Sequence, residues 1–244
     1  MHSVRTIAMC AVLGLSISAV DGGASAAGNE PDAPQLLHNA RLARAVWKDF
    51  PGCRAKLSLN INGQRGDGTL TVKPSGDVEL SGFPAGLDLA PAKAYLESLV
   101  NHRMADTAAD QEKVEFVPES QNHPLGPLIK FIGDEKLHST YRVHGDVVTE
   151  VNRVMGDTRF SIAVLDVFRN AAGKYTPRVF TVSFWDNATG AAKRSETHVN
   201  DWTTVGNFEL PLSVTLLKPS ASGNYVMEMT FRDHALLTSS GAGS

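Results

Sequence analysis

Histidines are the residues of this sequence whose type and spacing could carry metal chemistry. The chain has eight, and His138 and His144 lie in a segment that we expect to be extended. Six positions apart on a strand, they would project from the same face, as two ligands of one metal must. Six residues of strand span about 20 Å, however, whereas two nitrogens bound to one metal lie about 4 Å apart. We therefore assign both to a solvated polar face and expect no metal site.

His102 and Arg103 form a second group of potential interest, at the end of a helix predicted over about residues 89–104. Cations at this position complement the partial negative charge of the carboxyl end of a helix, and that structural role is sufficient to explain them. The alternative is that the two side chains face the mouth of a ligand cavity.

Sequence motifs for catalysis are absent. No H-x-x-x-H, C-x-x-C, G-x-S-x-G or Gly-rich phosphate loop occurs, and the acidic residues show no paired spacing on one element. We expect no cofactor, and an enzyme that uses dispersed His and Asp residues is the least favoured function. Cys53 has no second cysteine to pair with after Cys10 is removed, and it is typical of a small apolar residue opening a strand.

The N-terminal segment, residues 1–26, has the three parts of a secretory signal peptide. Arg5 precedes an apolar run over residues 7–20, and Ala24, Ser25 and Ala26 supply the small residues that precede cleavage. The run is shorter than the roughly 20 residues that span a bilayer, and no later segment is longer. We expect cleavage after Ala26 and an exported product, periplasmic or secreted, without a transmembrane segment.

Charge and composition limit the partners of the mature chain. The net charge is −3, and no block of five or more like charges occurs, so nucleic acid is not an expected partner. Strand patterns run almost without a linker, which predicts one domain over residues 27–236. The Ser- and Gly-rich tail, residues 237–244, is expected to be disordered.

Two helices are predicted. The first begins at the cap Asp32 and ends at Pro51; its apolar face would comprise Leu36, Ala40, Ala43, Trp47 and Phe50. The second, capped by Asp88, would present the apolar stripe Ala92, Tyr95, Leu96 and Leu99.

Period-2 alternation predicts about a dozen strands. They cover residues 54–61, 69–73, 77–80, 114–118, 137–144, 147–155, 159–169, 179–185, 192–199, 203–210, 212–217 and 225–231. Turns are expected at Asp186 to Gly190 and at Asp201 and Trp202. The fold class is therefore α+β: a curled antiparallel sheet, or half-barrel, wrapped over two amphipathic helices.

The segment 159–169 is expected to be a central strand covered on both faces, with Leu165 buried on one of them. Asp166 would share a face with Phe160, and as a buried carboxylate it would need Arg153 or Arg169 as its partner.

Four segments resemble an uncharacterised bacterial family of exported proteins with a domain of unknown function. They are HNARLARAVWKDFPGCRAKL, LVNHR, RFSIAVLDVFRNAAGKYTPRVFTVSFWDNATG and VGNFELP, and the likeness covers nearly the whole mature chain. That family has no known activity, so the resemblance implies no catalytic residues. The order of elements, closing on V-G-x-x-x-L-P, is also similar to the periplasmic carriers of outer-membrane lipoproteins, the LolA/LolB-like superfamily. This second resemblance implies a half-barrel and helices that enclose a cavity for acyl chains.

Two functions follow as hypotheses. The first is a carrier or sensor that binds a lipid or another apolar ligand without covalent chemistry. Its cavity would be lined by Trp47, Tyr95, Leu99, Phe180, Phe184, Met227 and Met229. The second is an interaction module for another envelope protein, with a core filled by its own side chains. An empty apolar cavity would favour the first hypothesis, and a filled core with an exposed apolar patch the second.

Overall fold

The computed structural model describes residues 31–104, 112–134 and 137–238. The predicted signal peptide lies outside these ranges, as do residues 239–244 of the tail, so cleavage and disorder stay predictions. At the end of the described chain, the Leu237 amide donates a hydrogen bond to the Gly52 carbonyl over 2.9 Å. No helix within the described ranges is long and apolar enough to cross a membrane.

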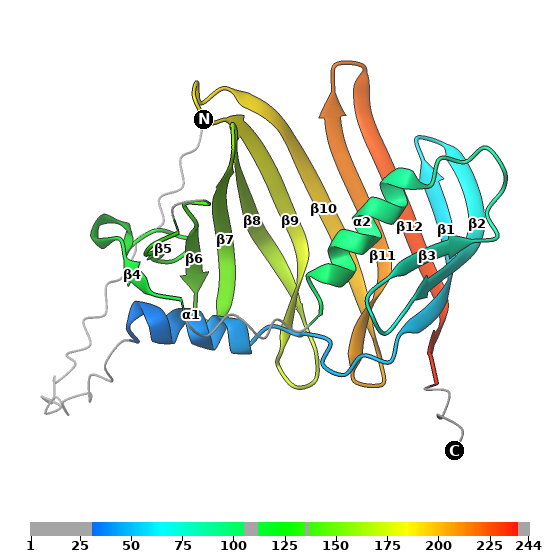
Figure 1. Cartoon of the computed structure of the whole chain (residues 1–244), viewed down its shortest axis with the longest axis horizontal. Helices are drawn as coiled ribbons and strands as arrows, with labels where there is room; N and C mark the ends of the chain where they lie inside the picture. The colour runs from blue at the N-terminus through cyan, green and yellow to red at the C-terminus, as the bar shows by residue number, and fades with distance from the viewer. Residues whose placement is uncertain (1–30, 105–111, 135–136, 239–244) are drawn as a thin grey trace, which may run out of the picture. The chain divides into compact units, whose positions relative to one another are not determined.

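Twelve strands of the described chain form one antiparallel sheet (Figure 1). They are β1 (Cys53–Ile61), β2 (Gln64–Val72), β3 (Val78–Ser81), β4 (Val114–Phe116), β5 (Leu128–Phe131), β6 (Thr140–His144), β7 (Val147–Met155), β8 (Thr158–Arg169), β9 (Tyr175–Asp186), β10 (Ala192–Val205), β11 (Phe208–Ser220) and β12 (Gly223–Leu236). Their order is β3-β2-β1-β12-β11-β10-β9-β8-β7-β6-β5-β4. The α+β class and the antiparallel sheet of about a dozen strands are thereby confirmed.

Within the described ranges the sheet is accompanied by two α-helices, α1 (Ala33–Leu42) and α2 (Ala90–Asn101), and a short 3₁₀ helix, η2 (Pro118–Ser120). The strands β3 and β4 are consecutive in sequence, yet they form the two opposite edges of the sheet. The chain between them must therefore pass from one edge to the other, and α2 belongs to this passage. Figure 1 shows α2 lying across the strands with which it shares a core.

The first predicted helix begins as expected and ends too early. The Asp32 carboxylate caps α1 by accepting the Gln35 amide over 2.9 Å, but the helix stops at Leu42. Beyond it the backbone pairs with β9: the Tyr175 amide donates to the Ala43 carbonyl, and the Ala45 amide donates to the Tyr175 carbonyl, each over 2.8 Å. The helical extension to residue 50 is wrong because this strand supplies hydrogen bonds that the helix would otherwise provide.

The second helix is also shorter than predicted; three residues of its predicted stripe are buried, and Tyr95 is half-buried. Ala92, Leu96 and Leu99 are buried against the sheet. Asp88 is not the capping residue, which is Leu89; the Asp88 carboxylate instead accepts the Ala90 amide over 3.0 Å.

The predicted turn at Asp201 and Trp202 is wrong. These residues form a β-bulge inside β10, and the hairpin lies farther on, between Val205 and Phe208. The three strands predicted over residues 192–199, 203–210 and 212–217 are therefore two strands, β10 and β11. The sequence did not predict β5. The Asp201 carboxylate does not stabilise a turn; it accepts a hydrogen bond from Arg178 Nε over 3.0 Å. The turn at Asp186 is confirmed, since its carboxylate accepts the Thr189 amide over 2.9 Å.

Buried apolar side chains form two separate clusters. The α2 core joins that helix to β1, β2, β3, β10, β11 and β12, and includes Leu57, Leu96, Met227, Met229 and Phe231. The α1 core joins Ala33, Leu37 and Ala40 to Val114, Ile129, Phe131 and Val143. Each helix thus covers a different part of the sheet.

Both cores lie on the same face of the sheet, because directly opposed residues of neighbouring strands share a face. One row of partners runs through Ile129, Tyr141, Val151, Ile162, Val182 and Glu196. A second runs through Val164, Phe180, His198, Leu216 and Met227. Ile162 and Val164 are two positions apart on β8, so the rows belong to one face. Part of this face, on β8 and β9, lies between the two cores and belongs to neither of them.

Candidate functional site

Six apolar residues occupy this face of β8 and β9, and we call them the central patch. They form three directly opposed pairs: Phe160 with Phe184, Ile162 with Val182, and Val164 with Phe180. All six are half-buried, and none belongs to either core. The opposite face of the same strands is mixed; there Ser161 opposes Ser183 and Ala163 opposes Thr181. The alternation in sequence therefore produces an apolar strip beside, and not inside, the helix-covered cores.

A stack of three rings connects the central patch to α2. The ring centroids of Phe180 and His198 are 4.3 Å apart with an interplanar angle of 7°, and those of His198 and Tyr95 are 5.7 Å apart at 22°. The Tyr95 hydroxyl also donates to Asn200 Oδ1 over 2.9 Å. One side chain of α2 thus reaches the end of the patch where Phe180 lies.

Charged groups border the patch on β10. Glu196 Oε2 lies 3.5 Å from His198 Nε2, and its other oxygen lies 3.2 Å from Arg194 Nε and 3.4 Å from Lys218 Nζ. His198 and then the Lys218 cation lower the pKa of Glu196 to about 2. The carboxylate is therefore ionised at neutral pH and surrounded by donors.

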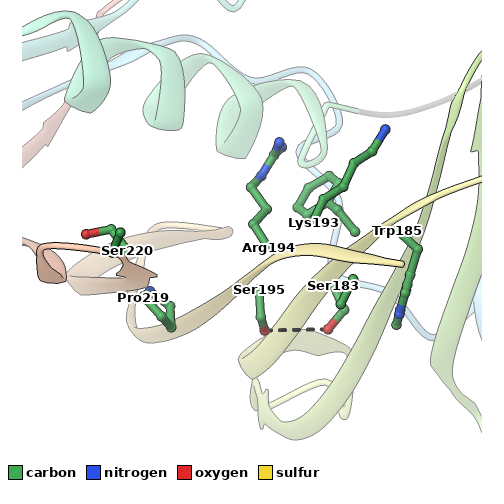
Figure 2. A pocket seen from close by; sticks show the side chains of 10 residues that line it. Ser183, Trp185, Lys193, Arg194, Ser195, Pro219 and Ser220 are labelled. Carbon is green, nitrogen blue, oxygen red and sulfur yellow. Dashed lines mark hydrogen bonds between the residues drawn. The ribbon is translucent and has the colours of Figure 1, made fainter. Parts of the chain in front are cut away.

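A hollow with a volume of about 460 Å³ lies at the other end of the patch, next to Phe184 (Figure 2). It is open to solvent and formed by residues from the ends of β9, β10 and β11. The Arg194 guanidinium lies 3.6 Å from the centroid of the Phe184 ring. Figure 2 shows Arg194 and Lys193 extending away from the side on which Ser183 and Ser195 are joined by a hydrogen bond. This end of the patch is consequently rimmed by cations.

The residues predicted to line a cavity divide into two groups. Trp47, Leu99, Met227 and Met229 are buried in the α2 core, which they help to fill. Phe180 and Phe184 belong to the central patch, and Tyr95 connects the two groups through its stack on His198. A ligand role for these seven residues stays a prediction.

The two residues proposed for a cavity mouth also differ from one another. His102 is exposed, and its Nδ1 lies 2.7 Å from the Ser98 carbonyl, at the end of α2. Arg103 is buried, with only 6% of its surface exposed. The structure therefore places the cation of Arg103 inside the protein.

His198, Glu196 and Asn200 are the polar residues of this region that the sequence reasoning missed. They alternate on β10, so the sequence did indicate a shared face. Nothing in the sequence indicated that the face is the one on which α2 packs, because that depends on the pairing of His198 with Leu216 of β11.

The predictions for β8 are wrong in two respects. Leu165, expected to be buried, is 62% exposed. Asp166 is also exposed and pairs with Arg178, with its Oδ2 lying 3.0 Å from Nη1. A β-bulge between Val164 and Asp166 changes the direction of these side chains. Neither expected partner is used, since Arg169 pairs with Asp146.

The two histidines considered as metal ligands are exposed. His138 has a positive φ of 44° and precedes β6, so only His144 is on the strand. No group of three or more His, Cys, Asp or Glu residues in the described ranges could hold a metal ion.

Comparisons with known proteins give one family. The model of a family described as "Protein of unknown function (DUF3386)" matches residues 29–237. No curated protein matches the chain. Among solved structures, a LolA superfamily protein from Nitrosomonas europaea has 9% identity and a TM-score of 0.31, covering 86% of this chain and 95% of its own. The Pseudomonas aeruginosa MucA/MucB complex matches with 12% identity and a TM-score of 0.22, covering 82% of this chain and 93% of that one. Scores this low carry no argument about function.

Proposed function

We propose, from the premise that this chain belongs to the DUF3386 family of proteins of unknown function, that it is an exported protein which binds an apolar or amphipathic ligand. The ligand would be a lipid or an acyl chain, and the protein would act as carrier or sensor without covalent chemistry. Since the family has no known activity, the support for this proposal comes from the geometry of the sheet.

The single observation that carries the proposal is the central patch. Its six large side chains are half-buried and contiguous in three cross-strand pairs. Removing apolar surface from water stabilises a complex by about 25 cal/mol per Å², and contiguous exposed apolar patches are typical of binding surfaces. Arg194 supplies a polar boundary at the Phe184 end of the patch.

Binding of an uncharged apolar fluorophore, N-phenylnaphthylamine, tests this function. We expect the purified full chain to bind the dye, and Ile162→Asn to weaken that binding about tenfold, the effect of about 1.4 kcal/mol of lost contact. Leu165→Asn is the matched control, because it introduces the same polar side chain on the same strand outside the patch. The proposal fails if the wild type does not bind the dye, or if both variants bind it as well as the wild type does.

The alternative, an interaction module for an envelope protein, is supported by the filled α2 core. Met227, Met229 and Phe231 have at most 1% of their surface exposed, so this core is occupied by the protein's own side chains. The central patch would then receive apolar side chains of a partner. Comparing the native and denatured mass of protein purified from an exporting host separates the two functions, since a bound lipid adds a discrete small mass.

A further inference from the structure

The two ends of the central patch differ in their access to water. At one end His198, which is 7% exposed, stacks on Phe180, and Tyr95 of α2 stacks on His198. At the other end Phe184 borders the hollow of about 460 Å³, which is open to solvent. The polar group of an amphiphile on the patch would lose its hydration against the stacked rings and keep it in the hollow. That polar group therefore belongs at the Phe184 end.

Arg194 presents hydrogen-bond donors at this end. Its guanidinium lies over the Phe184 ring, 3.6 Å from the centroid, and its Nε donates to Glu196 Oε1 over 3.2 Å. The two terminal nitrogens of Arg194 have no hydrogen-bond partner within the described ranges. The side chain is 55% exposed, so a ligand can reach these nitrogens. A guanidinium held on a ring in this way offers two parallel donors to an oxyanion.

The ion pairs around the hollow contain more positive than negative charge. Glu196 Oε1 lies 3.2 Å from Arg194 Nε and 3.4 Å from Lys218 Nζ, and Asp186 Oδ2 lies 3.3 Å from Lys193 Nζ. Three cations thus share two carboxylates. Two of the cations, Lys193 and Arg194, line the hollow, and neither carboxylate does. Because Glu196 is shared between two cations, its repulsion of an anion in the hollow is largely compensated.

We infer that Lys193 and Arg194 bind the phosphate head group of a single-chain amphiphile, whose alkyl tail lies along the central patch toward Phe180. A phosphate accepts two parallel hydrogen bonds from a guanidinium, and a lysine ammonium binds it as a point charge. Both cations line the same hollow, and Figure 2 shows their side chains extending to the same side. This inference rests on the proposed function, and it adds the head group of the ligand and its direction on the sheet.

Calorimetry on the full chain with decyl phosphate, decanol and inorganic phosphate, each below its micelle concentration, tests the inference. We expect decyl phosphate to bind about tenfold more tightly than decanol, the effect of charge-assisted hydrogen bonds, and the preference to shrink in about 1 M NaCl, where charges are screened within about 3 Å. Equal affinities for decyl phosphate and decanol would overturn the head-group inference and leave the proposed function standing. Inorganic phosphate bound as tightly as decyl phosphate would show a site for the free anion and overturn the inference. Absence of binding by both decyl compounds would overturn it together with the proposed function.

Arg194→Met is the decisive variant, because Met keeps the apolar stem over Phe184 and removes the charge. It should abolish most of the preference for decyl phosphate and leave the affinity for decanol unchanged, whereas a structural defect would weaken both. Lys193→Met should lower the same preference. The matched control is Arg159→Met, which removes an exposed cation beside Phe160 on the opposite face of β8, outside the hollow, and should leave both affinities unchanged. The inference is wrong if Arg194→Met keeps the preference, or if Arg159→Met reduces it equally.

Discussion

The imidazole ring of His198 lies almost parallel to the phenyl ring of Phe180, with an interplanar angle of 7° and 4.3 Å between their centroids. The contact joins neighbouring strands β9 and β10 at the boundary between the α2 core and the central patch. His198 contributes to packing there as a ring, and its Nε2 also lies 3.5 Å from Glu196 Oε2. Both the ring and Nε2 of His198 therefore make contacts at this boundary.

We predict that His198→Phe lowers the free energy of unfolding by about 1 kcal/mol at neutral pH, because the ring stack is kept but the ionised Glu196 carboxylate loses its contact with Nε2. Urea denaturation at neutral pH measures this change. The matched control is the same substitution in a Glu196→Gln background, where no carboxylate remains to lose a partner and the change should be smaller. A fall of equal size in both backgrounds would contradict the prediction.

Gly126→Ala should be strongly destabilising. Gly126 has φ of +88°, and a Cβ there would lie 2.0 Å from the Val143 carbonyl oxygen, between β5 and β6. Gly133→Ala isolates this clash, because Gly133 has a similar φ of +81° but nothing within 4 Å of the added carbon. We expect Gly133→Ala to cost about 1 kcal/mol for the backbone strain and Gly126→Ala at least about 2 kcal/mol more, as for overpacked sites. Similar urea midpoints for the two variants would show that Val143 moves freely.

Glu196 should make stability depend on pH in the acid range. Its pKa falls from 4.5 to about 2 on folding, chiefly through His198, so its ionised form stabilises the fold. That contribution is fully present above pH 4.5 and is lost as the pH falls toward 2. Glu196→Gln should therefore be less stable than the wild type at pH 6, with the difference shrinking between pH 4.5 and 2.

Urea midpoints measured across this range test the dependence. The control is Glu119→Gln, which changes an exposed carboxylate in η2 and should give a constant difference from the wild type. A constant difference for Glu196→Gln as well would contradict the prediction.

Cys53 should be unreactive in the native protein. It is 3% exposed at the start of β1, and burial raises the pKa of its thiol to about 11. Because the thiolate is the reactive form, iodoacetamide at pH 8 should label the native chain at least about a hundredfold more slowly than the urea-unfolded chain, whose thiol pKa returns to its ordinary range. Mass spectrometry of the labelled protein measures both rates. Rapid labelling of the native chain would show that β1 opens readily.

The sequence predicted the β-structure well where one face is buried and the other is polar. Met227, Met229 and Phe231 alternate on β12 and are all buried, as their period of two indicated. The same pattern identified Phe180 and Phe184 as neighbours on one face of β9. It could not identify the elements that cover them. The α2 core extends over β1 to β3 and β10 to β12, and it does not include the central patch on β8 and β9.

Long-range pairing explains the failures. The apolar spacing to Phe50 is helical, yet Tyr175 supplies the backbone partners that end the helix at Leu42. Asn200 and Asp201 are typical turn residues, but Tyr95 and Arg178 satisfy their side chains inside β10. A cation that follows a helix is usually exposed to solvent, whereas Arg103 is buried. No local sequence pattern indicates that burial.

The pairing of β1 with β12 also determines when the protein can fold. Ser58 and Arg232, hydrogen-bonded across these strands, are 174 positions apart, so the first strand to be synthesised has the last as its partner. At roughly 5–20 residues per second, β1 waits on the order of ten seconds or more for β12 to be made. Until then the α2 core lacks Met227, Met229 and Phe231, and the closing loop is long. A chain interrupted before Gly223 would retain both β1 and β11 as unpaired edges. Formation of the C-terminal hairpin is therefore the step that completes the α2 half of the sheet.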